Sequence, residues 1–215
     1  APRPSGDPAR PSQGLEPPFS RARSLASLGF FLHASFKAIP MDTLLRLSHG
    51  IDAMSRFIGK FIIWLVLAAA VISAANAVAR KAFSIGSNAF LEIQWYLFAW
   101  SFLLAAAFTL LNQEHVKIDV LYSRLARRTQ VWIDIFGFIF FLTPFCAVIM
   151  YYAIPVVMSK ISSGEMSGNT GGLILWPVWI ALPIGMCLLM LQGWSEAIKR
   201  VAFLRGEIPD PAEKS

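Results

Sequence analysis

Four long apolar blocks alternate with short polar or basic segments along the chain. The first block, FIIWLVLAAAVISAANAVA, fills residues 61–79 between Lys60 and Arg80 without a formal charge. At about 1.5 Å per residue, a helix of this length matches the hydrocarbon thickness of a bilayer. Three further blocks are likewise long and predominantly apolar. Together the four blocks predict transmembrane spans at residues 61–79, 92–113, 133–159 and 173–196.

Two amphipathic segments accompany these spans. Across residues 41–60, apolar side chains recur every three or four positions while charged side chains occupy other faces, which predicts an entry helix leading into the first span. Residues 115–130, HVKIDVLYSRLARRTQ, predict a short helix at the membrane interface. Pro144 and Pro155 fall inside the third span, which we expect to be kinked or tilted. The predicted fold is all-α, with four transmembrane helices and two interfacial helices.

The remaining segments complete a simple organisation. Residues 1–20 are rich in proline and almost without large apolar side chains, so we expect no packed structure there. Residues 21–40 carry basic residues around a short apolar stretch that resembles a signal or an amphipathic anchor. We expect residues 1–40 as a whole to be a disordered or mobile extension. The membrane domain then covers residues 61–200, and residues 201–215 form a tail. Basic residues concentrate in the second linker and at both ends of the domain, which predicts that both termini are cytoplasmic.

Composition supports a membrane protein and argues against several other classes. The chain is 56% hydrophobic, and its net charge of +6 is scattered between apolar blocks, which gives no support for nucleic-acid binding. An ion-coupled carrier usually keeps an ionisable group deep in the membrane, and none of the four spans has a charge near its centre. His33, His49 and His115 lie outside the spans, which disfavours haem. No P-loop or metal-ligand cluster appears in the sequence, so we expect no catalytic residue, cofactor or metal in this chain.

Polar residues at the span ends are the candidate contacts. Glu92 begins the second span beside Gln94 and Trp95. Its carboxylate is stabilised either by the helix dipole and a basic neighbour, or by a contact with another subunit. His115 and Asp119 lie four residues apart, so they could pair on a helix or cap the interfacial helix. We treat all five as candidate structural or intersubunit contacts.

The third linker, SSGEMSGNTGG, offers a second candidate site. Glu165, Ser167 and Asn169 stand among four glycines, a composition that is typical of turns. These three residues either shape the loop or form an external docking site, and the sequence leaves both interpretations open.

Two longer stretches carry a family resemblance. They are EIQWYLFAWSFLLAAAFTLLNQEHVKIDVLYSRLARRTQVWIDIFGFIFFLTPF and SSGEMSGNTGGLILWPVWIALPIGMCLLMLQGWSEAIK. Their E-x-Q-x-Y-like start to span two, HV-x-x-D segment and G-E-x-S loop resemble the small DctQ-type membrane subunit of tripartite ATP-independent periplasmic (TRAP) transporters. The resemblance covers roughly residues 41–200, and the proline-rich extension departs from the family pattern.

The resemblance implies partners that the residues alone do not reveal. A large DctM-type membrane subunit would hold the substrate and sodium sites and move as an elevator, and a soluble periplasmic binding protein would deliver organic acids. The small subunit would brace the fixed scaffold in the bacterial cytoplasmic membrane, with Glu165, Ser167 and Asn169 on the side where the binding protein docks. The alternative is a self-contained four-helix sensor or assembly factor that functions without a large partner.

Overall fold

The computed structural model describes residues 40–84, 87–112 and 125–209, and from Met41 onward these belong to one compact unit. Within this part of the chain the regular elements are helical, with one isolated bridge between Met166 and Ile174. Four helical stretches are long and apolar enough to cross a membrane, which confirms the predicted all-α fold with four spans. The elements are α2 (Met41–Phe83), α3 (Asn88–Leu111), α5 (Arg127–Phe136), η1 (Gly137–Leu142), α6 (Thr143–Ser163), α7 (Trp176–Trp179) and α8 (Ala181–Leu204).

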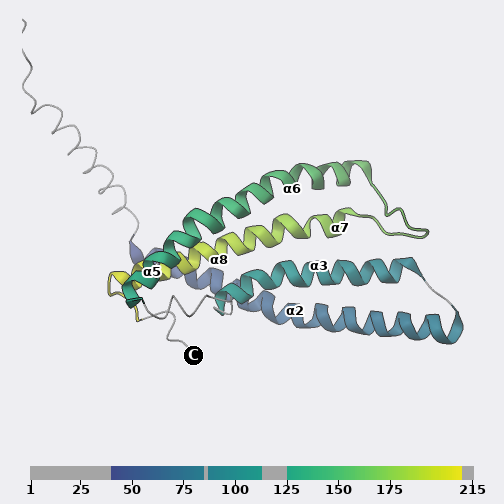
Figure 1. The fold of residues 1–215 in the computed structure, drawn as a ribbon, viewed down its shortest axis with the longest axis horizontal. Coiled ribbons are helices and arrows are strands. Elements are labelled where there is room, and N and C mark those ends of the chain that lie inside the picture. The colour runs from purple at the N-terminus through teal and green to yellow at the C-terminus, as the bar shows by residue number, and fades with distance from the viewer. Residues whose placement is uncertain (1–39, 85–86, 113–124, 210–215) are drawn as a thin grey trace, which may run out of the picture. The chain divides into compact units, whose positions relative to one another are not determined.

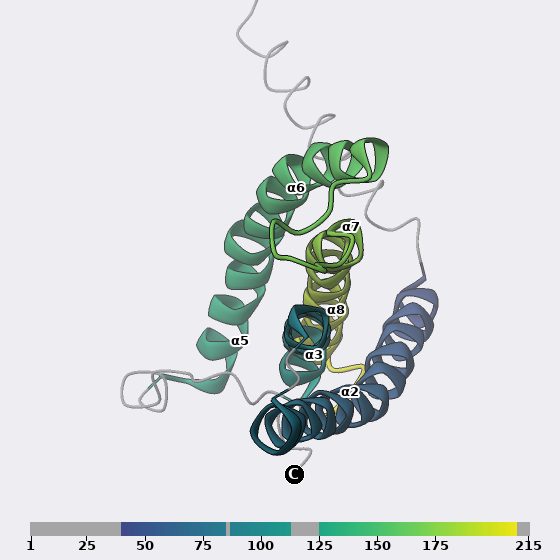
Figure 2. The same cartoon turned by 90° about the vertical axis from the view of Figure 1, so that its right-hand side faces the viewer.

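Helices α3 and α8 form the centre of the bundle. Figure 2 shows α2 on one side of this pair and α5 with α6 on the other, and Figure 1 shows the long helices running side by side. The contact between α3 and α8 is close because Gly185 carries no side chain, and a Cβ built there would lie 2.7 Å from the Leu103 Cβ. Small residues allow membrane helices to approach in this way.

The first span and the predicted entry helix are one continuous helix, α2, of 43 residues. Its buried face consists of small and polar residues, whereas large apolar side chains point outward. Gly59 is part of this buried face, and a Cβ at this position would lie 2.4 Å from the Phe108 ring. The other buried residues of α2 are Ser48, Asp52, Ser55, Ala69 and Asn76.

The third span departs from regular helix where the sequence predicts a kink. Residues Gly137–Leu142 form a π-helix immediately before Pro144, whose ring and missing N–H disturb an α-helical ladder. Thr143 binds the Phe138 carbonyl twice, through its backbone N–H and through its Oγ1, which donates at 2.8 Å. Pro155 lies inside α6, which continues as a helix to Ser163. The irregularity of the third span is therefore a π-helical turn beside the first proline, and the expected kink or tilt stays a prediction.

Large apolar side chains cover the outside of the bundle. Phe102 is 78% exposed, Phe57 74%, and Trp64 and Ile63 68% each. A surface of this kind is stable in lipid and costly in water. Together with the four spans, it describes a multi-pass membrane protein.

The predicted interfacial helix at residues 115–130 lies largely outside the described residues. Its last four residues, 127–130, are the first turn of α5 and so belong to the third span's helix.

Candidate functional site

One end of the bundle is closed by a loop that binds the Glu92 carboxylate. Asn169 Nδ2 donates to Glu92 Oε1 at 2.8 Å, the Leu173 backbone N–H donates to Oε2 at 2.6 Å, and the Ser167 hydroxyl also donates to Oε1. Glu92 is only 4% exposed, so these bonds replace much of its hydration. The carboxylate therefore fastens the loop between α6 and α7 onto α3. We call Glu92, Ser167, Asn169 and Leu173 the loop clamp.

Three further side chains of α3 hold the same loop and the start of the fourth span. Asn88 Nδ2 donates to the Thr170 carbonyl at 3.2 Å, Tyr96 Oη to the Ile174 carbonyl at 2.9 Å, and Trp100 Nε1 to the Pro177 carbonyl at 2.9 Å. These donors lie at steps of eight and four residues along one face of α3. These bonds tie backbone carbonyls of the loop and of the first turn of the fourth span to α3.

Glycines permit the path of the loop. Gly164 ends α6 with a positive φ of 59°, a conformation that residues with a Cβ rarely adopt. Gly172 packs against Ser167, and a Cβ at position 172 would lie 2.6 Å from the Ser167 Cβ. Gly164 and Gly172 are thus required by the path of the loop that brings Ser167 to Glu92.

The structure brings together three of the residues singled out in the sequence, Glu92, Ser167 and Asn169. Trp95 is 65% exposed, and Gln94 is partly buried beside it. Glu165 points elsewhere, forming an ion pair of 2.5 Å with Lys160. Helix α3 begins at Asn88, so Glu92 lies beyond its first turn, and the loop supplies the hydrogen bonds to its carboxylate. His115 and Asp119 fall outside the described residues.

A second polar site joins α2 to α8 near the far end of the bundle. Asp52 Oδ1 accepts hydrogen bonds from Gln192 Nε2 at 2.9 Å and from Ser195 Oγ at 2.8 Å. Its other oxygen accepts from Lys199 Nζ at 3.0 Å. Ser55 Oγ donates to Gln192 Oε1 at 2.7 Å, which extends the network along α2.

Charged residues continue this network across α8 to α5. Arg200 donates from its Nε to Asp134 Oδ2 at 2.9 Å and from NH1 to Glu196 Oε2 at 2.6 Å, and Lys199 also contacts Glu196. The fourth predicted span ends at residue 196, where the sequence places Glu196, Lys199 and Arg200. All three lie inside α8, which continues to Leu204, and Glu196 and Arg200 are buried. Lys199 pairs with Asp52 of α2 and Arg200 pairs with Asp134 of α5. Both cations also pair with Glu196, and these ion pairs compensate for the burial of the charges.

We call these connected residues the inner network: Ser48, Asp52, Ser55, Asp134, Gln192, Ser195, Glu196, Lys199 and Arg200. The sequence does contain a signal for this network. Polar or small residues recur at three- and four-residue steps on α2, on the face opposite the apolar residues of the predicted entry helix. A matching set recurs on α8. Two such faces predict a polar helix contact, although which helices meet is a tertiary property.

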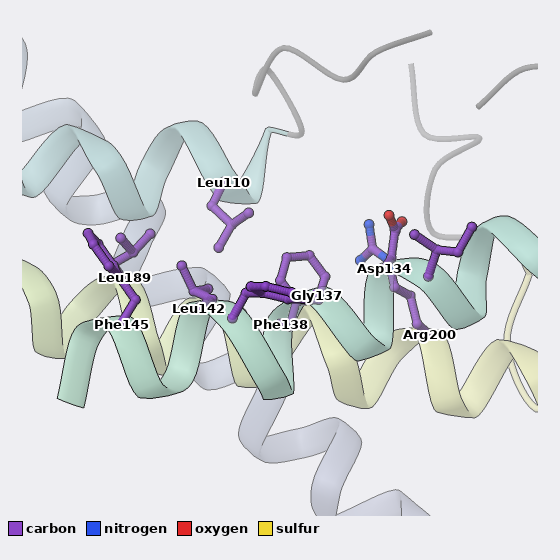
Figure 3. A pocket seen from close by; sticks show the side chains of 10 residues that line it. Leu110, Asp134, Gly137, Phe138, Leu142, Phe145, Leu189 and Arg200 are labelled. Atoms are coloured by element: carbon purple, nitrogen blue, oxygen red, sulfur yellow. The ribbon is translucent and has the colours of Figure 1, made fainter. Parts of the chain in front are cut away.

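An apolar groove lies between α8 and the third span. It has a volume of about 640 Å³ and opens sideways from the bundle. Figure 3 shows Phe145 and Leu189 at one end of it and Asp134 and Arg200 at the other. The π-helical turn forms part of its wall through Gly137, Phe138, Phe141 and Leu142.

The described residues are equipped for holding helices together. Among them, each buried side-chain nitrogen and oxygen has a hydrogen-bond partner, and no three His, Cys, Asp or Glu residues are grouped to bind a metal ion. Fully partnered networks of this kind fix one arrangement of helices.

Comparison with known families identifies the chain. Residues 69–203 match the family model of tripartite ATP-independent periplasmic transporters, DctQ component. This match covers more than half of the 215 residues. The chain belongs to the DctQ family. DctQ proteins are components of transporters and form no enzyme family, so this chain is a small subunit of a TRAP transporter. Among curated proteins, no significant match to the chain was found.

The DctQ match includes the loop clamp, the groove and the α8 half of the inner network. It begins at Ala69 and so leaves the first part of α2, with Ser48, Asp52 and Ser55, outside the matched range.

Proposed function

We propose that this DctQ chain is the fixed scaffold of a sodium-coupled, binding-protein-dependent transporter for organic acids. It braces a large DctM-type elevator subunit, which carries the substrate and sodium sites, in the bacterial cytoplasmic membrane. Both termini are cytoplasmic, since basic residues concentrate at that side. The inner network then lies near the cytoplasmic leaflet and the loop clamp on the periplasmic side.

The observation that carries this proposal is the contrast between a closed interior and an open apolar side. The polar groups of the inner network and loop clamp are paired within the chain, which supports a rigid role. The groove beside α5, η1 and α6 offers space for side chains of another apolar helix. We place the contact with the large subunit there.

The loop clamp refines the role proposed for the periplasmic side. Ser167 and Asn169 bind Glu92, so they support the loop, while Met166 is 60% exposed on its outer surface and Glu165 is also exposed. We propose that the binding protein meets this outer surface and that the clamp holds it in place.

Co-purification tests the scaffold role. The tagged full-length chain is expressed with its large partner, extracted in mild detergent and assayed for stoichiometric recovery of that partner. The double variant Phe141→Ala/Phe145→Ala removes two exposed rings from the groove. We expect the amount of large partner recovered with the variant to fall about tenfold or more, because each ring buried at an interface contributes on the order of 1–2 kcal/mol to the binding free energy.

The matched control is Phe98→Ala/Phe102→Ala, which removes two exposed rings with the same four-residue spacing from α3. It should retain the partner as the unchanged chain does. Equal retention by both double variants would exclude the groove as the contact. Recovery of the unchanged chain alone, repeated in native-like lipid, would instead favour the self-contained sensor or assembly factor.

A further inference from the structure

The first part of α2 separates its charges in a way that the sequence pattern does not show. Asp52 faces inward and binds α8, whereas Arg46, His49, Arg56 and Lys60 are exposed. We call these four residues the basic stripe. At 3.6 residues per turn, they fall within an arc of about 80° on the helix. Asp52 is therefore used internally, whereas the four basic groups remain on the outside together with Asp42, an exposed acid one turn before Arg46.

The basic residues of α8 differ from the basic stripe, because they are paired within the chain. Lys199 and Arg200 form ion pairs with Asp52, Glu196 and Asp134. Within the described part of the chain, no ion pair engages the three permanently charged side chains of the basic stripe. Their charge is available to a partner outside the chain.

An exposed apolar strip runs beside the basic stripe. Leu47, Met54, Phe57 and Phe61 are 58%, 36%, 74% and 52% exposed. On an ideal helix their mean direction lies about 110° from that of the stripe. An apolar strip beside a basic one matches the boundary between acyl chains and phosphate headgroups. Long basic side chains reach headgroups while their stems cover apolar surface.

We propose that the basic stripe and this apolar strip form a binding surface for anionic phospholipids. The headgroup phosphates lie against Arg46, Arg56 and Lys60, and the acyl chains lie against Phe57 and Phe61. Charge complementarity selects anionic over zwitterionic lipid here. The surface is distinct from the proposed partner contact, because α2 and α5 with α6 lie on opposite sides of α3 and α8 (Figure 2).

Lipid retention tests the proposal. The full-length chain is reconstituted in nanodiscs containing phosphatidylcholine and phosphatidylglycerol, and native mass spectrometry measures the ratio of the two lipids that remain bound. We expect enrichment of phosphatidylglycerol over its bulk fraction. The triple variant Arg46→Gln/Arg56→Gln/Lys60→Gln should lower this enrichment at least about fivefold at low ionic strength, the effect expected from a single basic residue at an anionic surface.

The matched control is Arg80→Gln/Lys81→Gln/Arg205→Gln, which removes the same charge from exposed positions outside the stripe. It should keep the enrichment. High salt should weaken the enrichment of the unchanged chain, because exposed charges are screened. Absence of enrichment, insensitivity to salt, or equal enrichment in the two triple variants would overturn the proposal. The proposal would also be overturned if the variant of the basic stripe no longer bound the large subunit but kept its enrichment of phosphatidylglycerol, since the stripe would then be a protein contact.

Discussion

Replacing Glu92 by Gln should release the loop between α6 and α7 from α3. The substitution keeps the size of the side chain and its helix propensity but leaves one acceptor oxygen where the carboxylate has two. Ser167 and Asn169 both donate to Oε1, so an amide oxygen placed there would turn its NH₂ group toward the Leu173 N–H. Two donors would then face each other.

The size of the effect follows from these bonds. A hydrogen bond to a charged group contributes about 1.5–3 kcal/mol, and the variant loses one such bond and weakens two others. Allowing for water that enters the opened site, we expect local stability of the loop to fall by about 2–4 kcal/mol. Since about 1.4 kcal/mol is a factor of ten, opening becomes about 30-fold to several-hundredfold more frequent.

Hydrogen exchange followed by mass spectrometry, with the full chain in nanodiscs, measures this opening. The amides of Ser167, Gly172, Leu173 and Leu175 donate hydrogen bonds within the loop or to Glu92 and should exchange faster in the variant. The matched control makes the same chemical change at Glu165, whose side chain is 47% exposed in its pair with Lys160. An exposed pair contributes at most about 1 kcal/mol.

Equal changes in loop exchange for Glu92→Gln and Glu165→Gln would show that the Glu92 carboxylate does not hold the loop. Faster exchange throughout α3 in Glu92→Gln would show that the carboxylate supports the helix and not the loop.

Two further predictions concern α2 and are measured as melting temperature of the purified full-length chain. Gly59→Leu should lower stability by about 1–3 kcal/mol, because its Cβ would meet the Phe108 ring, whereas Gly50→Leu, with nothing within 4 Å, should cause no loss. Asp52→Ala removes the acceptor of three donors in the inner network and should lower the free energy of unfolding by about 3–5 kcal/mol. Its control, Asp42→Ala at an exposed position, should lower it by well under about 1 kcal/mol. Equal melting temperatures within either pair would contradict the packing described.

The sequence was sufficient for the membrane spans because bilayer thickness is a local constraint. A run of about 20 apolar residues must be helical in lipid, whatever lies beside it, so the four spans follow from composition alone. Pro144 likewise predicted a disturbance in the third span, since the missing N–H is a property of the residue itself. Hydropathy did not predict the form of that disturbance, a π-helical turn that shapes the groove.

Partners within the chain were decided only by the tertiary structure. Glu92 and Asn169 are 77 positions apart, and Asp52 and Lys199 are 147 apart, so no local pattern pairs them. The sequence also could not say that Glu196 and Arg200 are buried, because their group of charges is completed by Asp52 and Asp134 from other helices.

The number and nature of the helices can be read from the amino-acid sequence, since lipid imposes the same requirement on each span independently. The packing of the bundle sets which polar faces are turned inward and which remain for a partner or for lipid. Burial of a charge depends on a group supplied by another helix, and only the packed bundle brings the two together.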